Sequence, residues 1–310
     1  MIAAALAVPL AGIAALALLP LALPPFYIGV ATEILVFALL AMSIDVLAGF
    51  AGRTPLCHGA IFGTSTYVVI LCAPAMPLPL AMLAGIAAAG ILSLVFGAIA
   101  VRTSGVYFLL LTLALGLIVW GVCLRWTAMT GGENGIRGDL RHGWLADARA
   151  LYWVVLAAGT MLAAAMWRLV RSPFGLTLRG IKDSPSRMQA LGHDVSLHLL
   201  LAFVASGLFA GTAGALYALY NDFVSPTTVA LPQSVEGLLM AIAGGIGTLF
   251  GALAGAALLI GLELVVSAWT ERWPTVLGLT AILLMIVAPE GLVGKARAAL
   301  GTRRSTGGIR

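Results

Sequence analysis

"AMLAGIAAAGILSLVFGAIAV", residues 81–101, is an uninterrupted apolar stretch, and it sets the class of fold. About 20 apolar residues are enough for a helix to cross a hydrocarbon layer of ~30 Å. A strand of an outer-membrane barrel would instead alternate apolar and polar residues, which this stretch does not do. Similar stretches recur along the 310-residue chain. The sequence therefore predicts a helical protein that crosses a membrane several times.

The composition of the whole chain agrees with this class. Hydrophobic residues make up 61% of the sequence and charged residues 9%, whereas charged residues are about 25% of a soluble domain. The net charge of +5 is expected to come from basic loops that orient the protein, not from nucleic-acid binding. Cys57, Cys72 and Cys123 lie in apolar stretches without metal-ligand spacing. We therefore predict small buried side chains there, with neither a disulfide framework nor a metal site.

The apolar stretches divide the chain into ten predicted crossings, separated by prolines and by polar links. They are residues 2–23, 30–49, 56–73, 80–101, 104–124, 150–170, 199–220, 235–248, 249–268 and 274–290. The first stretch has no basic residues before it, so we interpret it as a crossing and not as a cleaved signal peptide. The expected fold is an all-α polytopic membrane domain over residues 1–294, followed by a basic tail, 295–310.

The distribution of basic residues indicates how the chain is oriented. With ten crossings and a cytoplasmic N-terminus, twelve Lys and Arg residues lie on the cytoplasmic side and five on the other side. One long crossing over 235–268 would move the basic C-terminal tail outside, against the positive-inside rule, so two short crossings are favoured. Short segments interrupted by glycine are also typical of the substrate path of a transporter.

Glycines recur at four-residue spacing in two of the stretches. Small residues on one helix face let neighbouring backbones approach closely in a membrane, so we expect these glycines to serve helix packing. They are Gly247, Gly251 and Gly255 in one stretch and Gly207 and Gly211 in the other. Residues 35–52 also resemble residues 200–216 weakly, which suggests two internal repeats.

A polar, basic segment, "SPFGLTLRGIKDSPSRMQALGHDV" (172–195), interrupts the apolar pattern. Ser184 and Pro185 form a helix start, a hydroxyl N-cap followed by proline at the first helical position, and Gly192 fits the helix end. A helix of fewer than two turns is marginal in water and needs a partner surface. The segment is therefore either a solvated loop that carries orientation signals or a cytoplasmic helix that docks into another protein.

This segment resembles the cytoplasmic coupling loop of permeases from high-affinity branched-chain amino-acid ABC importers. In that family a Ser-x-x-Gly-x-x-x-Arg lead-in precedes a short helix that ends in a small residue, one spacer and glycine. Here these residues are Ser172, Gly175, Arg179, Ala190 and Gly192. Other stretches resemble the M-type permease of that family in the same order: "GRTPLCHGAIFGTSTY" (52–67), "GVYFLLLTLALG" (105–116), "TGGENGIRG" (130–138), "SVEGLLMAIAGGIGTLFGALAGA" (234–256) and "PEGLVG" (289–294).

The resemblance, which covers most of residues 30–294, implies a subunit of an ATP-driven importer in a bacterial-type inner membrane. Its partners would be a second, homologous permease, two cytoplasmic ATPases and an extracytoplasmic solute-binding protein. Residues 172–198 would form the coupling loop, and both termini would be cytoplasmic. The expected ATPase contacts are Asp183, Ser184, Arg187, Ala190, Leu191 and Gly192.

The importer interpretation predicts that the chain is not itself an enzyme. No cofactor is expected on it, because ATP and Mg²⁺ would be bound by the partner ATPases. The stretch "GLVGKA" (291–296) contains Gly-Lys, but Pro289 stands where a phosphate loop begins with glycine, and Ala296 replaces its Ser or Thr.

Two other classes stay open on the residues alone. An ion-coupled secondary transporter usually has ionisable groups near the membrane midplane. The carboxylates here are predicted toward segment ends: Glu33, Asp45, Glu236 and Glu263. A membrane metalloenzyme needs paired ligands, and the histidines form no such motif: His58, His142, His193 and His198.

Two polar patches are candidates for the substrate path. The first consists of His58 and the hydroxyl groups that follow it, which could help to hold a zwitterion or an amide: Thr64, Ser65, Thr66 and Tyr67. Alternatively, His58 satisfies a hydrogen bond at a helix end. The second patch is Ser234, a predicted N-cap whose helix N-terminus suits a carboxylate. Glu236 would pair with an ammonium group or complement the helix dipole.

The residues around His58 do not identify the transported solute. Arg53, Pro55 and Cys57 stand where the resembling family usually has Gln, Ser and Gly. The resemblance therefore implies branched-chain amino acids or another small polar solute, such as urea or a short amide.

The longest polar loop, residues 125–149, is predicted to lie outside the membrane. Its "TGGENGIRG" stretch should form tight turns, because Gly and Asn tolerate positive φ. The loop is either a solvated cap or, as the resemblance implies, a docking face for a solute-binding protein.

Overall fold

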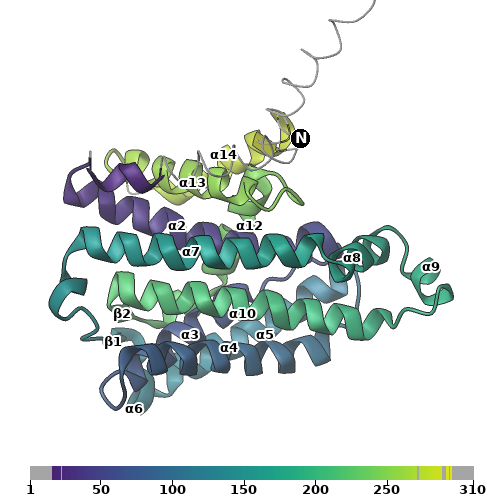
Figure 1. The fold of residues 1–310 in the computed structure, drawn as a ribbon, viewed down its shortest axis with the longest axis horizontal. Helices are drawn as coiled ribbons and strands as arrows, with labels where there is room; N and C mark the ends of the chain where they lie inside the picture. Colours follow the sequence, from purple (N-terminus) through teal and green to yellow (C-terminus); the bar gives the residue numbers. More distant parts are fainter. Residues whose placement is uncertain (1–15, 22, 271, 288–290, 293, 295–310) are drawn as a thin grey trace, which may run out of the picture.

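The protein is an all-α bundle of apolar helices, seen in a computed structural model that describes residues 16–21, 23–270, 272–287, 291–292 and 294. Figure 1 shows the longest helices side by side, with connecting segments gathered at the two ends of the bundle. The helices are α2 (Pro25–Asp45), α3 (His58–Cys72), α4 (Leu78–Ala100), α5 (Val106–Arg125), α6 (Thr127–Thr130), α7 (Ala148–Arg171), α8 (Pro173–Asp183), α9 (Pro185–Ala190), α10 (Val195–Asn221), α11 (Pro226–Val229), α12 (Leu231–Gly244), α13 (Gly251–Ser267) and α14 (Trp273–Val287).

Three short helices of other types and two strands are also present among the described residues. The π-helix η1 (Val46–Ala51) continues α2, and two 3₁₀ helices, η2 (Gly132–Asn134) and η3 (Gly143–Ala146), lie in the 125–149 loop. Strand β1 (Ile136–Arg137) pairs antiparallel with β2 (Phe223–Val224), so that Ile136 faces Val224.

The helices agree with the predicted crossings. Among the described residues, five helices are long and apolar enough to cross a membrane: α2 with η1, α4, α5, α7 and α10. Shorter apolar helices, α3 and α13, fall within two further predicted crossings. The prediction of an all-α polytopic membrane protein is therefore confirmed. The first predicted crossing, 2–23, lies largely outside the described residues.

The exposure of the side chains distinguishes the helix at the centre of the bundle from the helices at its surface. Residues 35–51 of α2 and η1 are all buried, so this segment is apolar on every side because protein surrounds it. In contrast, α4 and α5 each expose a row of large apolar side chains, including Leu83, Ile91 and Ile118. Such rows suit a hydrocarbon environment, since lipid tails are as apolar as these side chains.

The predicted break within 235–268 is confirmed. Helices α12 and α13 are separated by residues 245–250, in which Gly245 (φ 115°), Gly247 (φ 81°) and Leu249 (φ 55°) have positive φ. The two helices then pack backbone to backbone, because Gly244 lies against Gly251 and Gly255 lies against Met240.

The helix-packing prediction for the spaced glycines is confirmed for four of the five. Gly207 and Gly211 of α10 lie against Ser93 and Ala89 of α4, and Gly251 and Gly255 lie against α12. Gly247 is the exception, because its positive φ places it in the loop and not on a helix face.

Candidate functional site

The polar segment 172–195 folds into two capped helices at one end of the bundle. Ser172 caps α8, its Oγ accepting from Gly175 N at 3.4 Å, and Ser184 caps α9, its Oγ accepting from Arg187 N at 3.4 Å. Gly192 ends the second helix with φ 87°, and its N–H donates to Gln189 O at 2.9 Å. The predicted N-cap, proline start and glycine stop of α9 are thus where the sequence placed them. The separate helix α8 was not predicted.

Helix α9 projects from the bundle and leaves most of its side chains free for a partner. Met188 holds it to α8, since its Sδ lies 2.7 Å from where a Cβ on Gly180 would stand. Leu191 is 74% exposed although it is apolar, and Arg187 is exposed beside it. The six predicted ATPase-contact residues therefore lie between the last residue of α8 and the glycine after α9, and they offer charged, polar and apolar groups at once.

A buried polar cluster lies at the centre of the bundle. His58 begins α3, as predicted, and is 0% exposed; its Nε2 lies 2.7 Å from Ser206 Oγ of α10. Ser206 Oγ in turn donates to the carbonyl of Ser43 in α2 at 2.6 Å. Because a carbonyl can only accept, the hydroxyl proton is committed there, and His58 Nε2–H must be the donor to Ser206. The remaining Nδ1 of His58 has no partner among the described residues.

The two predicted substrate-path patches meet in the structure. Gly59 N, next to His58, donates to Ser234 Oγ at 2.8 Å, so the first turns of α3 and α12 are in contact. The prediction that Ser234 caps its helix is wrong. Helix α12 begins three residues earlier, at Leu231, because Pro232 fixes a helical φ there. Glu236 consequently lies in the second turn of α12, not beside its N-terminus.

The hydroxyl groups of the first patch are divided between two environments. Thr64 Oγ1 donates to Ala60 O at 2.7 Å, and Thr66 Oγ1 lies 3.0 Å from Gly214 O of α10. These two groups are satisfied by the backbone. Ser65 Oγ and Tyr67 OH are buried with no hydrogen-bond partner in the described part of the chain.

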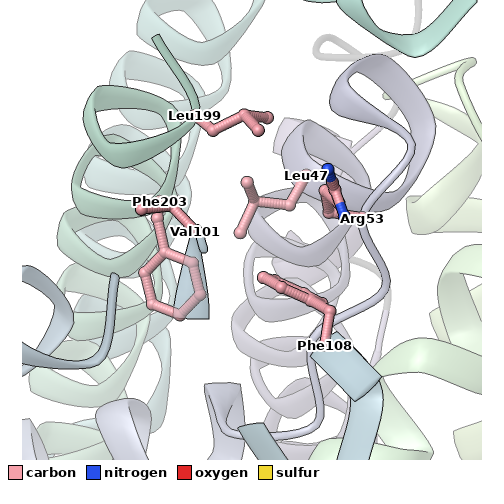
Figure 2. A pocket seen from close by; sticks show the side chains of 6 residues that line it. All are labelled: Leu47, Arg53, Val101, Phe108, Leu199 and Phe203. Atoms are coloured by element: carbon pink, nitrogen blue, oxygen red, sulfur yellow. The ribbon is translucent and has the colours of Figure 1, made fainter. Parts of the chain in front are cut away.

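An apolar crevice, too narrow to admit a water molecule, lies between η1, α5 and α10 (Figure 2). It is lined by Leu47, Arg53, Val101, Phe108, Leu199 and Phe203. Arg53 is its one charged lining residue; its Nη1 donates to Thr103 O at 2.8 Å, and its guanidinium lies 5.8 Å from the centre of the Phe108 ring. Phe203 also packs beside His58, with ring centres 6.0 Å apart, so the crevice adjoins the buried polar cluster.

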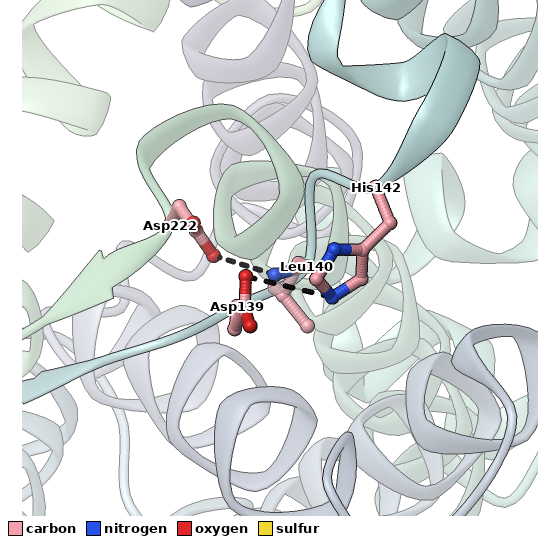
Figure 3. A network of polar contacts seen from close by, with 4 residues as sticks. All are labelled: Asp139, Leu140, His142 and Asp222. Atoms are coloured by element: carbon pink, nitrogen blue, oxygen red, sulfur yellow. Dashed lines mark hydrogen bonds and ion pairs between the residues drawn. The ribbon is translucent and has the colours of Figure 1, made fainter.

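The 125–149 loop is fastened to the opposite end of the bundle. Asp222, which ends α10 with φ 52°, accepts from Leu140 N through Oδ1 at 3.1 Å, and its carbonyl accepts from Gly138 N at 2.9 Å. Figure 3 shows this anchor beside the exposed pair of His142 and Asp139, at 3.4 Å. The tight turns predicted for "TGGENGIRG" are present: three glycines of this stretch have positive φ, namely Gly131, Gly132 and Gly135.

Some residues that organise these sites were not singled out from the sequence. Ser206 and Ser43 lie in apolar stretches, and Asp45 was predicted only as a carboxylate near a segment end. A single buried polar residue in an apolar run is a signal that could have found each of them, because such residues need a partner. Among the described residues, no group of three His, Cys, Asp or Glu side chains is placed to hold a metal ion.

These features define a multi-pass membrane transport protein: membrane-length helices surround buried polar groups, and a capped helix projects at one end. The sequence profile described as "Branched-chain amino acid transport system / permease component" matches residues 26–288. The chain therefore belongs to this family of permeases, which are transport subunits and not enzymes.

Individual relatives agree with the family. The high-affinity branched-chain amino acid transport system permease protein LivM of Salmonella typhimurium is 28% identical over 303 residues, covering 87% of this chain and 70% of the relative. LivH of the same organism is 22% identical over 84% of this chain and 91% of the relative. The autoinducer 2 import system permease protein LsrC of Klebsiella pneumoniae is 29% identical over 53% of this chain and 51% of the relative. No solved structure matches the chain.

Proposed function

We propose that this chain is the M-type permease subunit of an ATP-binding-cassette importer for branched-chain amino acids. The observation that carries the proposal is α9, a short capped helix whose exposed turn holds an apolar side chain, Leu191. A helix of six residues is not stable by itself in water, so this exposed turn is suited to a groove on a partner. Two cytoplasmic ATPases, which bind ATP and Mg²⁺, would each engage one coupling helix of the permease pair.

The orientation of the chain follows from its charges. The bundle end that carries α8 and α9 (Figure 1) has seven basic residues, whereas the 125–149 loop at the opposite end has four. The seven are Arg53, Arg102, Arg168, Arg171, Arg179, Lys182 and Arg187, and the four are Arg125, Arg137, Arg141 and Arg149. Because cytoplasmic loops carry the excess of basic residues, the α8–α9 end is assigned to the cytoplasm. The 125–149 loop then faces the solute-binding protein.

The substrate path is assigned to the contact between the first turns of α3 and α12. Two helix N-termini meet there, and their partial positive charge suits a carboxylate. The Nδ1 of His58, which has no partner among the residues that the structure describes, offers an acceptor for an ammonium group. Ser65, Tyr67 and Glu236 belong to the same two helices.

The partner proposal is tested by affinity purification in a mild detergent from the native host, followed by mass spectrometry. Recovery of an ATPase and a second permease in comparable amounts is the expected result. Recovery of this chain alone, under conditions that preserve a known ABC complex, would favour a self-sufficient transporter.

The solute and the role of α9 are tested by uptake into proteoliposomes that hold the complex. We expect ATP-dependent uptake of leucine, isoleucine or valine; preferential uptake of urea or acetamide would change the solute assignment. Gly192→Pro and Arg187→Glu should leave the chain inserted but abolish uptake or release the ATPases. Normal ATP-driven uptake by both variants would refute the role of α9.

A further inference from the structure

The π-helix η1 lies between the coupling loop and the α12–α13 loop. Its six residues, Val46–Ala51, are all buried, and Gly52 closes it with φ 67°. Single π-helical turns inside α-helices occur frequently at functional sites. The contacts on the two faces of η1 indicate what this turn does.

On one face, Asp45 holds the α12–α13 loop by its backbone. Its Oδ1 accepts from Gly247 N at 2.7 Å and its Oδ2 accepts from Leu249 N at 3.0 Å. Asp45 is 1% exposed, so both of its carboxylate oxygens are used inside the protein. Hydrogen bonds from backbone N–H groups to a buried carboxylate are among the stronger ones in proteins. Leu249 keeps its unfavourable positive φ beside this contact.

Gly49 brings the two backbones together at the same place. A Cβ on Gly49 would lie 2.5 Å from Gly247 N and 2.7 Å from Gly247 Cα. No residue with a side chain fits there without moving the α12–α13 loop. The loop is therefore in direct backbone contact with η1 as well as bonded to Asp45.

On the other face, α8 holds η1 through two basic side chains. Lys182 Nζ donates to the carbonyl of Gly49 at 2.8 Å. The guanidinium of Arg179 lies 4.9 Å from the centre of the Phe50 ring, within the range of a cation–π contact. The stem of Lys182 also packs on Gly52, its Cγ lying 2.8 Å from where a Cβ would stand.

We infer that Asp45 and Lys182 are positioning residues that transmit the movement of the coupling loop to the α12–α13 hairpin. The inference rests on the proposed importer function. A displacement of α8 is passed to Gly49 by Lys182, and from η1 to the α12–α13 loop by Asp45. The loop follows because its own N–H groups are bonded, not a side chain that could rotate away.

The inference is tested with Asp45→Asn and Lys182→Met in the reconstituted complex with both ATPases. Asparagine keeps the size of the side chain but presents a single acceptor oxygen, so one of the two N–H groups of the loop loses its partner. Methionine keeps the apolar stem of Lys182 and removes its donor. Solute uptake and ATP hydrolysis are both measured, and their ratio is the readout.

We expect both variants to assemble with the ATPases and to hydrolyse ATP, while the solute transported per ATP falls at least about five-fold. Lys182→Arg, which keeps a donor, should restore most of the ratio. Arg168→Ala is the matched control, since Arg168 is an exposed basic residue in the last turn of α7, outside α8 and η1.

The inference is overturned if either assembled variant transports the same amount of solute per ATP as the unaltered chain. It is also overturned if uptake and hydrolysis fall together, because the ratio would then be unchanged. If Asp45→Asn fails to fold, Lys182→Met decides alone, since it removes nothing from the buried core. Failure of the unaltered chain to bind ATPases would instead refute the proposed function, before any variant is compared.

Discussion

Gly255→Ala should separate helices α12 and α13, which are in backbone contact at this point. A Cβ on Gly255 would meet the carbonyl oxygen of Met240 and would lie 2.8 Å from Gly244 N. Real Cβ atoms essentially never come within 3.0 Å of such atoms, and a backbone cannot rotate out of the way. The two helices must therefore move apart along their contact.

The size of the effect follows from the cost of overpacking. Inserting a methyl group into a close-packed contact costs about 1–3 kcal/mol, since the helices lose contacts as they separate. Alanine also gains up to about 1 kcal/mol over glycine in helix propensity. Gly261→Ala, on the same helix, has the same gain, and among the described residues its new Cβ would have no atom within 4 Å other than the backbone of its own helix. The difference between the two variants isolates the overpacking term.

The assay is thermal unfolding of both variants in the same detergent. Unfolding is monitored as the loss of the monodisperse peak in size-exclusion chromatography after heating. At about 2–4 °C per kcal/mol, Gly255→Ala should unfold roughly 2–12 °C below Gly261→Ala. Equal unfolding temperatures would refute the conclusion that α12 and α13 form a backbone-packed hairpin.

Two further substitutions test other contacts. Ser206→Ala leaves the ring N–H of buried His58 without its acceptor, which should cost about 1–3 kcal/mol, and removes the hydroxyl that donates to Ser43 O. Thr212→Ala, which removes an exposed hydroxyl from the same helix, should unfold close to the unaltered chain, and equal unfolding temperatures for the two variants would contradict the cluster. Asp222→Ala removes the acceptor of Leu140 N and places alanine at φ 52°, so trypsin should cut the 125–149 loop faster at Arg137 and Arg141. Asp222→Asn, which keeps an acceptor oxygen, should be cut as slowly as the unaltered chain, and unchanged cleavage of Asp222→Ala would contradict the anchor.

The helices could be predicted because a membrane imposes long apolar runs. Residues 80–101 were predicted for the helix that the structure has at Leu78–Ala100. The helix predicted at 199–220 begins earlier, at Val195, because Asp194 caps it by accepting from Leu197 N at 3.0 Å. Polar first turns of this kind lie outside the membrane, so hydropathy alone does not detect them.

The contacts of the candidate sites could not be predicted, because they join residues far apart in the sequence. His58 and Ser206 are separated by 148 positions, and Asp45 and Gly247 by 202. No local sequence motif links the two residues of either pair. The residues of the π-helical turn between Asp45 and Gly52 are apolar, so the sequence does not distinguish them from an ordinary α-helix. The cap, proline and glycine of α9 could be predicted because all three act within a few residues of the helix they bound.

The location of α12 connects the coupling loop with the candidate substrate path. Its C-terminal end continues into the loop that Asp45 holds, and its first turn contacts α3 through Ser234 and Gly59.

Between these two ends, α12 packs on α2 through side chains, as where Gly237 faces Leu40 and Ile44. Side chains can slide past one another, as they do in shear motions of packed helices, whereas backbone contacts such as Gly255 with Met240 hold α13 to α12. A helix of 14 residues is about 21 Å long. A displacement of the end of α12 near Asp45 is therefore expected to move the whole α12–α13 hairpin, including the first turn of α12 beside His58.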